Sequence, residues 1–408
     1  MQSAALVERR RDIRVMSVVG VCHFFSHFYQ FALIPLFILI NRHEGYSFES
    51  LGLLITVFFI ASFSLQIPVG FFVDKFGART ILMTGIGTMA TATMLYGLFP
   101  SYSTMVVFAA LAGMGNSVFH PADYSILAAS VTKPRLGRAF SIHNLGGFVG
   151  YAVAPLTMAA LGEAYGWQTA LIAAGIAGLL VMLVSIALSG DFRDSSHARR
   201  EVAVKNSLGQ DLRMLMAPAL LLCILFFALL AGGQVGVQFN ADKVFNVAHG
   251  IPLLIGNSFV TIFVVGAIFG VIGGGIVADR KEDPLNVTFL SFLASSLMVV
   301  LLSLTPPWMP AVYALIAAAG FFFGFGFAAR DLVVSRIAPP EASGKVFGFV
   351  FSGLDIGCAI VPAIYGYLLD VGRPLVVFYI AAVLIFLSAF SVYAAGRSVS
   401  PRRVRAGP

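Results

Sequence analysis

Long apolar stretches separated by short clusters of charge dominate this chain. Only 11% of its 408 residues are charged, whereas a soluble protein carries about a quarter. Each stretch runs for about twenty residues, which is long enough to cross a hydrocarbon layer of about 30 Å as a helix. The alternating pattern of a membrane β-barrel is absent from the sequence, so helices are the expected spanning structure.

The apolar stretches predict twelve membrane-spanning helices. They are expected at residues 15–40, 49–73, 80–98, 104–131, 138–162, 167–189, 215–240, 251–277, 286–304, 310–334, 345–369 and 374–395.

Lysine and arginine are unevenly distributed between the loops. The two termini and the even-numbered loops hold 22 of the 26 cations, and the odd-numbered loops hold only Arg42, Lys243 and Arg373. Because basic loops stay on the cytoplasmic side, we expect a multi-pass protein of the bacterial inner membrane with both termini in the cytoplasm. The stretch after Arg14 is too long for a signal peptide and is interpreted as the first span.

A short motif occurs once in each half of the chain. Residues 70–79 (GFFVDKFGAR) contain Asp74, and residues 275–281 (GIVADRK) contain Asp279, 205 positions later. In each copy a glycine is expected to end a membrane helix, and an acid and cations follow in a tight loop. A repeat at half the chain length indicates duplication, which in a membrane protein points to a transporter whose substrate binds between the halves.

A second set of matches has a constant offset of 207 positions. The matched pairs are Gly137 with Gly344, Arg138 with Lys345, Phe140 with Phe347, Gly146 with Gly353, Gly150 with Gly357 and Pro155 with Pro362. The polar segment between the two sets of six spans predicts the domain boundaries. We expect an N-terminal six-helix bundle at 1–190, a cytoplasmic linker at 191–213 with a short helix at 207–213, and a C-terminal six-helix bundle at 214–408.

The G-x-x-x-D-[RK]-x-G pattern after span two and its echo after span eight resemble the major facilitator superfamily. Gly115–Pro121 (GNSVFHP) and Gly137–Ser141 (GRAFS) resemble its fosmidomycin-resistance branch more narrowly. The resemblance implies two six-helix bundles that work by alternating access, with spans one, four, seven and ten lining a central cavity. Two drug-antiporter motifs of the superfamily are not matched, because Ala109 replaces an arginine and residues 146–150 lack the expected proline.

The repeated motif suggests a gating role at the cytoplasmic face. We expect Asp74 to pair with Arg138 and Asp279 with Lys345, as a latch that stabilises the outward-open state. Simple helix capping is the alternative. The residues assigned to this role are Gly70, Asp74, Lys75, Gly77, Arg79, Arg138, Asp279, Arg280 and Lys345.

Ionisable residues inside spans are costly and therefore mark candidate sites. His23, His27 and Gln30 follow one another by one turn on a single face of the first span. In span four, His120 and Asp123 share a face, and Pro121 is expected to kink the helix between them. Histidine titrates near neutral pH, so these residues predict a path for protons. Core histidines bonded to backbone carbonyls are the alternative.

Five further polar residues complete the predicted substrate and proton site. They are His143, Gln234, Gln238, Arg330 and Asp355. Arg330 lies 207 positions after Asp123, so the two occupy equivalent places in the repeats. We expect them to form a contact between the halves that closes the inner gate. Pairing within each half, Asp123 with His120 and Arg330 with Asp331 or Asp355, is an equal alternative.

Together these features predict a monomeric proton-coupled secondary transporter for a small organic compound, with an anionic compound suggested by Arg330. Efflux is favoured by the resemblance. Proton-coupled uptake of an organic acid, or transport of a metal ion or metal chelate by the histidines, is the alternative. A transporter-like sensor is a further class. No Gly-rich phosphate loop is present in the sequence, so we expect neither ATP use, nor a cofactor, nor enzymatic activity.

Overall fold

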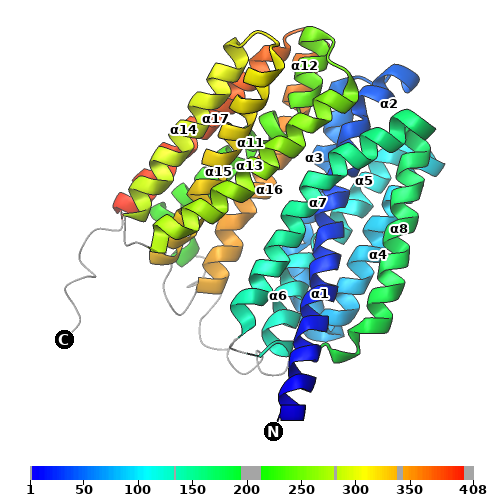
Figure 1. Cartoon of the computed structure of the whole chain (residues 1–408), viewed down its shortest axis with the longest axis vertical. Helices are drawn as coiled ribbons and strands as arrows, with labels where there is room; N and C mark the ends of the chain where they lie inside the picture. Colours follow the sequence, from blue (N-terminus) through cyan, green and yellow to red (C-terminus); the bar gives the residue numbers. More distant parts are fainter. Residues whose placement is uncertain (1, 133–134, 194–212, 280–282, 338–342, 399–408) are drawn as a thin grey trace. The chain divides into compact units, whose positions relative to one another are not determined.

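The computed structural model describes residues 2–132, 135–193, 213–279, 283–337 and 343–398 (Figure 1). The chain divides into two compact units, Met1–Lys205 and Asn206–Pro408, called here the first and second unit. The division falls within the segment 191–213 expected as the linker. Residues 194–212 of that segment, with most of the helix expected there, lie outside the described residues.

The described elements of the first unit are all helical. They are α1 (Gln2–Ala32), the 3-10 turn η1 (Ile34–Leu36), α2 (Phe37–Glu44), α3 (Phe48–Phe76), α4 (Ala78–Leu98), α5 (Tyr102–Asn116), α6 (Phe119–Ser130), α7 (Leu136–Tyr165), α8 (Trp167–Leu188) and the 3-10 turn η3 (Ser189–Asp191).

The second unit is built in the same way. Its described helices are α11 (Pro218–Gln238), α12 (Ala241–His249), α13 (Leu253–Asp279), α14 (Pro284–Leu304), α15 (Met309–Ile337), α16 (Ser343–Asp370) and α17 (Pro374–Ser398).

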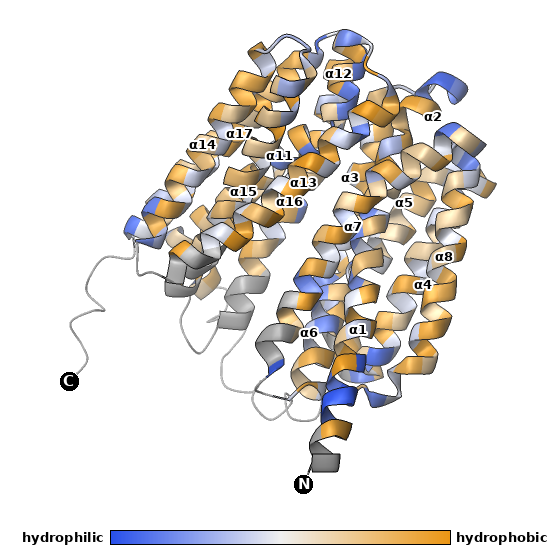
Figure 2. Ribbon diagram, in the orientation of Figure 1, coloured by the Kyte–Doolittle hydropathy of each residue, from blue (hydrophilic) through white to orange (hydrophobic). Residues whose placement is uncertain are grey.

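Twelve helical segments are long and apolar enough to cross a membrane, six in each unit. They confirm the twelve spans predicted from the sequence. Figure 2 shows that the helix middles are predominantly hydrophobic, whereas hydrophilic residues gather at α2, at α12 and near the start of α1. This pattern is that of helices solvated by lipid along their length and by water at their ends.

Two spans of the first unit are interrupted. The first consists of α1, η1 and α2, and the fourth consists of α5 and α6. The expected kink at Pro121 is instead a break at Ser117 and Val118, which places Pro121 in the first turn of α6. A proline is tolerated there because its missing N–H would have no intrahelical acceptor.

The two motif glycines do not end their helices, contrary to expectation. Helix α3 continues past Gly70 to Phe76, and α13 continues past Gly275 to Asp279. A glycine inside a helix weakens it by about 1 kcal/mol relative to alanine but does not terminate it. The break comes at Gly77, whose φ of 84° is easily reached only by glycine.

The same close contact between two helices occurs within each unit. A Cβ added to Gly113 would lie 2.1 Å from the Phe58 carbonyl oxygen, and one added to Gly320 would lie 2.0 Å from that of Phe263. Gly113 and Gly320 are 207 positions apart, so the contact of α5 with α3 recurs between α15 and α13.

A second close contact recurs in the two units, that of α7 with α1 and that of α16 with α11. Gly150 of α7 approaches the Phe24 carbonyl of α1, and Gly357 of α16 approaches the Ala228 carbonyl of α11. Gly150 and Gly357 are again 207 positions apart. The pseudo-symmetry of the two bundles is therefore carried by glycines at helix crossings.

Replacing Gly320 with alanine should force α15 away from α13, because the new Cβ would overlap the Phe263 carbonyl. We expect a loss of about 1–3 kcal/mol in unfolding free energy, measured as a lower melting temperature of the purified protein in detergent. Gly273→Ala is the matched control, because its Cβ would meet Phe325 at an ordinary 3.4 Å. Equal melting temperatures for both variants would contradict this packing.

Candidate functional site

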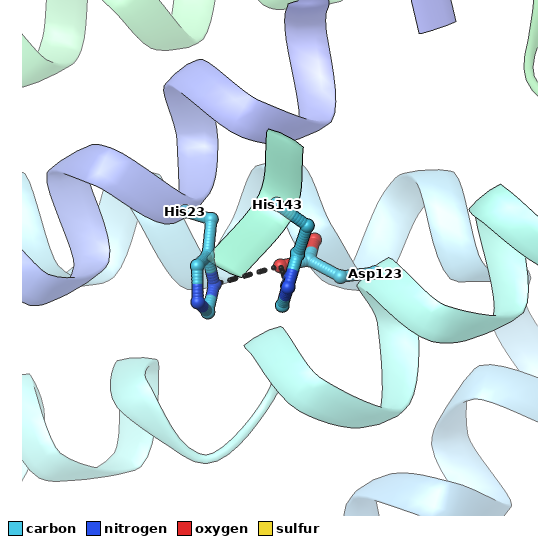
Figure 3. Close-up of side chains that lie close together, drawn as sticks. All are labelled: His23, Asp123 and His143. Atoms are coloured by element: carbon cyan, nitrogen blue, oxygen red, sulfur yellow. Dashed lines mark hydrogen bonds and ion pairs between the residues drawn. The ribbon is translucent and has the colours of Figure 1, made fainter. Parts of the chain in front are cut away.

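Three side chains from three helices meet inside the first unit. The Asp123 Oδ2 atom, on α6, lies 3.1 Å from His23 Nδ1 on α1 and 3.0 Å from His143 Nε2 on α7 (Figure 3). The exposed fractions of His23, Asp123 and His143 are 3%, 0% and 1%. These residues, called here the His–Asp cluster, place a charged group where an unpaired charge would be very costly.

Asp123 reaches the histidines from the second turn of α6, which begins at Phe119. Both described hydrogen bonds of its carboxylate are made with other helices, one with α1 and one with α7. Two partners were expected for Asp123, Arg330 of the other half or His120 of its own helix, whereas the described hydrogen bonds are with His23 and His143.

The cluster is surrounded by further imidazole rings. The His23 and His143 rings stack with their centroids 3.6 Å apart and their planes 25° apart. The rings of His27 and His120 lie 4.5 Å and 5.6 Å from that of His23. The four histidines predicted as site residues therefore form one group within the first unit.

Both ring nitrogens of His143 face a polar side chain. Its Nε2 atom faces Asp123 Oδ2, and its Nδ1 atom faces Asn144 Oδ1 at 3.3 Å. An N–H on Nδ1 can donate to Asn144 Oδ1, which leaves the lone pair of Nε2 directed at the Asp123 carboxyl group. A proton shared with that carboxyl group, or a metal ion, could bind at this lone pair.

An amide network extends from the cluster along α1. Tyr151 donates its hydroxyl hydrogen to Gln30 Oε1, and its ring lies 4.2 Å from that of His27. Gln30 donates to Asn116 Oδ1 at 2.9 Å, and Asn116 donates to Ser62 Oγ at 3.0 Å. Gln30 was predicted as a site residue, whereas the other hydrogen-bonding members were missed. Asn116 lies within the quoted 115–121 motif, which was the available signal.

The equivalent position in the second unit has different chemistry. The Arg330 guanidinium carbon lies 4.1 Å from the ring centroid of Phe327 and 5.1 Å from that of Phe227. Phe327 lies 207 positions after His120, as Arg330 does after Asp123. The second unit thus carries a cation among aromatic rings where the first carries an acid among histidines.

Two predicted residues of the second unit contact each other. Gln234 Nε2 donates to Gln238 Oε1, and Gln238 is buried. Asp355, another predicted site residue, is also buried. These positions remain candidates for substrate contacts.

Lys243 differs from its expected place in an exposed outer loop. It lies on the unpredicted helix α12, is 1% exposed and donates from Nζ to Asp242 Oδ1 at 2.8 Å. Burial lowers the pKa of the Lys243 ammonium, and the Asp242 carboxylate opposes that shift. The pair lets a charged helix pack at the end of the second unit.

The gating residues are described only in part. The side chains of Asp74, Arg138, Asp279 and Lys345, and all of Arg280, lie outside the described residues. Arg79, another residue assigned to gating, donates from Nε to Ser189 Oγ at 2.7 Å and from Nη2 to the Ile186 carbonyl at 3.0 Å. It thereby caps the end of α8, where carbonyls lack helical partners.

A buried acid missed in the sequence lies near the start of α1. Asp12 is 0% exposed and accepts hydrogen bonds from Thr132 Oγ1 at 2.6 Å and Arg135 Nη1 at 2.9 Å. It ties α1 to the segment between α6 and α7. Nothing in the local sequence distinguished Asp12 from the other charges near the N-terminus.

A sequence model of the Major Facilitator Superfamily matches residues 19–316 and 305–407. The chain belongs to this superfamily. It is therefore of a transporter family rather than an enzyme, and the resemblance seen in its motifs is confirmed.

The chain is also similar to individual proteins of this superfamily and to solved structures. The fosmidomycin resistance protein of Escherichia coli strain K12 is 23% identical over 368 residues, which cover 88% of each chain. The membrane sensor protein UhpC of Salmonella typhimurium strain LT2 is 26% identical over 334 residues, covering 74% of this chain and 73% of UhpC. A bacterial homologue of the human lysosomal transporter Spinster, solved in an inward-facing conformation, has the same fold. It superposes with a TM-score of 0.76 at 14% identity, over 95% of this chain and 97% of that chain.

Asn116 of α5 bridges Gln30 of α1 and Ser62 of α3 by hydrogen bonds. Replacing Asn116 with alanine should therefore weaken the packing of α3 and α5 against α1. Leaving their buried polar groups unpaired should lower the unfolding free energy by about 1–3 kcal/mol, seen as a lower melting temperature. The neighbouring Ser117→Ala is the control, since the described hydrogen bond of Ser117 Oγ is to the Met114 carbonyl of its own helical turn. A loss as large in Ser117→Ala would rule out the bridge as the cause.

Proposed function

We propose that this superfamily member is a proton-coupled secondary transporter that moves a small organic compound by alternating access, with efflux as the favoured direction. The buried His–Asp cluster carries the proposal. It is a group of buried ionisable side chains inside an apolar bundle, and such groups mark ion and proton pathways in membrane proteins. The name of the fosmidomycin resistance relative supports efflux of a toxic compound.

The proton is proposed to reside between Asp123 and its two histidines. The Asp123 Oδ2 atom faces one nitrogen of each ring, at 3.1 Å and 3.0 Å, and the two rings stack with their centroids 3.6 Å apart. A proton shared by these groups would therefore lie where all three side chains meet. Its release or uptake would change the charge of the α1, α6 and α7 junction, which is the kind of local event that biases a two-state transporter.

Arg330 is the proposed contact for an anionic substrate, with Gln234 and Gln238 as hydrogen-bonding groups. A guanidinium is always charged and presents several donors to a carboxylate or phosphonate. We further propose a monomer in the bacterial inner membrane, and the distribution of basic residues supports an orientation with both termini in the cytoplasm. The gating residues around Asp74 and Asp279 are proposed to control access from that side.

Asp123→Asn should uncouple transport from the pH gradient, because the amide cannot hold the shared proton. Inside-out vesicles with an acidic interior should accumulate fosmidomycin or a related small organic anion with the wild-type protein. The variant should fall to the level of vesicles without the protein while retaining exchange of preloaded substrate. Glu163→Gln, an exposed acid of the same unit, is the matched control. Unchanged accumulation by Asp123→Asn would remove the cluster from the coupling path.

A sensor is the second candidate function, favoured by the similarity to UhpC. A sensor would bind its ligand without moving it. Ligand-dependent protection from thermal unfolding with no flux in the vesicle assay would support this function, whereas gradient-driven flux would exclude it.

A further inference from the structure

We propose that His23, Asp123 and His143 form a binding site for a divalent transition-metal ion of the Zn²⁺ or Co²⁺ class. This inference goes beyond the proposed transport function and does not depend on it. The ion would be held by the same atoms that are proposed to share the coupling proton, so the two would compete for the cluster.

The ligand atoms are positioned for one small ion. His23 Nδ1, His143 Nε2 and an Asp123 carboxylate oxygen all lie within 4.8 Å of one another. Tetrahedral zinc sites with bonds of about 2.0–2.1 Å have ligand atoms about 3.3 Å apart. The two histidine nitrogens lie 3.1 Å and 3.0 Å from the shared oxygen, so small side-chain rotations would place an ion between the three groups.

Two buried polar atoms point to a ligand at this place. Asp123 Oδ1 and His27 Nδ1 have no hydrogen-bond partner among the residues described. The ring of His27 lies 4.5 Å from that of His23, so both atoms belong to the same group of side chains. An ion bound by the Asp123 carboxylate would compensate the buried charge that Oδ1 shares.

The surrounding helix is shaped to hold the rings. A Cβ added to Gly147 of α7 would lie 3.0 Å from His27 Nε2 and 3.1 Å from His23 Nε2, so the glycine lets both rings approach the helix closely. Asn144 Oδ1 contacts the His143 nitrogen that faces away from the cluster. Metal-binding histidines are commonly oriented in this way by an outer acceptor, which directs the other nitrogen to the metal.

The donor set selects the class of ion. Two imidazoles and one carboxylate suit zinc, cobalt or nickel, whereas magnesium and calcium prefer oxygen ligands alone. Three protein ligands leave a fourth position for water or for an oxygen of a bound compound. His120 of α6 places a further imidazole ring 5.6 Å from that of His23.

The test uses the full-length protein in detergent, stripped of metal with a chelator and titrated with Zn²⁺ alone by calorimetry. Co²⁺ absorption then reports the coordination geometry. We expect one ion per chain in a four-coordinate site. His23→Gln, Asp123→Asn and His143→Gln should each weaken binding by at least about 100-fold, and Asn144→Ala by about 10–100-fold. His43→Gln, an exposed histidine of α2, should bind as the wild type does.

Variant folding is checked by monodispersity and by the melting temperature without metal, and Asn144→Ala keeps the test valid if a ligand variant fails to fold. The site would be refuted if Asn144→Ala and the ligand variants bound Zn²⁺ as tightly as the wild type does. It would also be refuted if the wild-type protein did not bind Zn²⁺ stoichiometrically. The vesicle assay, run in chelator, separates the two proposals. Transport that remains dependent on Asp123 in a protein that binds no Zn²⁺ leaves the transport function standing and this inference refuted.

Discussion

Close contact between helix backbones is the constraint on which both bundles depend. Lipid is as apolar as leucine, so the hydrophobic effect does not hold membrane helices together as it holds a soluble core. The contacts that do so are the glycine crossings, such as Gly113 against Phe58 and Gly320 against Phe263. In the first unit, Gly150 makes such a crossing between α7 and α1, and it is beside these two helices that the side chain of Asp123 on α6 meets those of His23 and His143.

The polar cluster is the local exception to this apolar packing. An aspartate with no exposed surface is tolerated because two histidines approach one of its oxygens. A buried acid held by imidazoles can exchange a proton or bind a metal ion, whereas an acid paired with arginine or lysine could do neither easily. The choice of partner therefore gives the site its chemistry.

The sequence predicted the helices and their duplication well, because apolar length and a constant repeat offset are direct consequences of the membrane. It grouped the four histidines with Asp123, since intramembrane ionisable residues are few. It did not predict the break between α5 and α6, because Pro121 starts α6 rather than kinking one helix. Nor could it predict that Asp123 would meet His23 and His143, since partners on other helices depend on crossing angles that a local pattern does not encode.

The repeats conserve helix geometry while differing in charge. Arg330 occupies the place of Asp123, and Phe327 occupies that of His120. A guanidinium keeps its charge throughout the biological pH range, whereas a carboxylate among imidazoles can be neutralised. Acidification would therefore change the charge at the place of Asp123 and leave the charge at the place of Arg330 fixed, so that two equivalent positions of common origin would respond unequally to the same gradient.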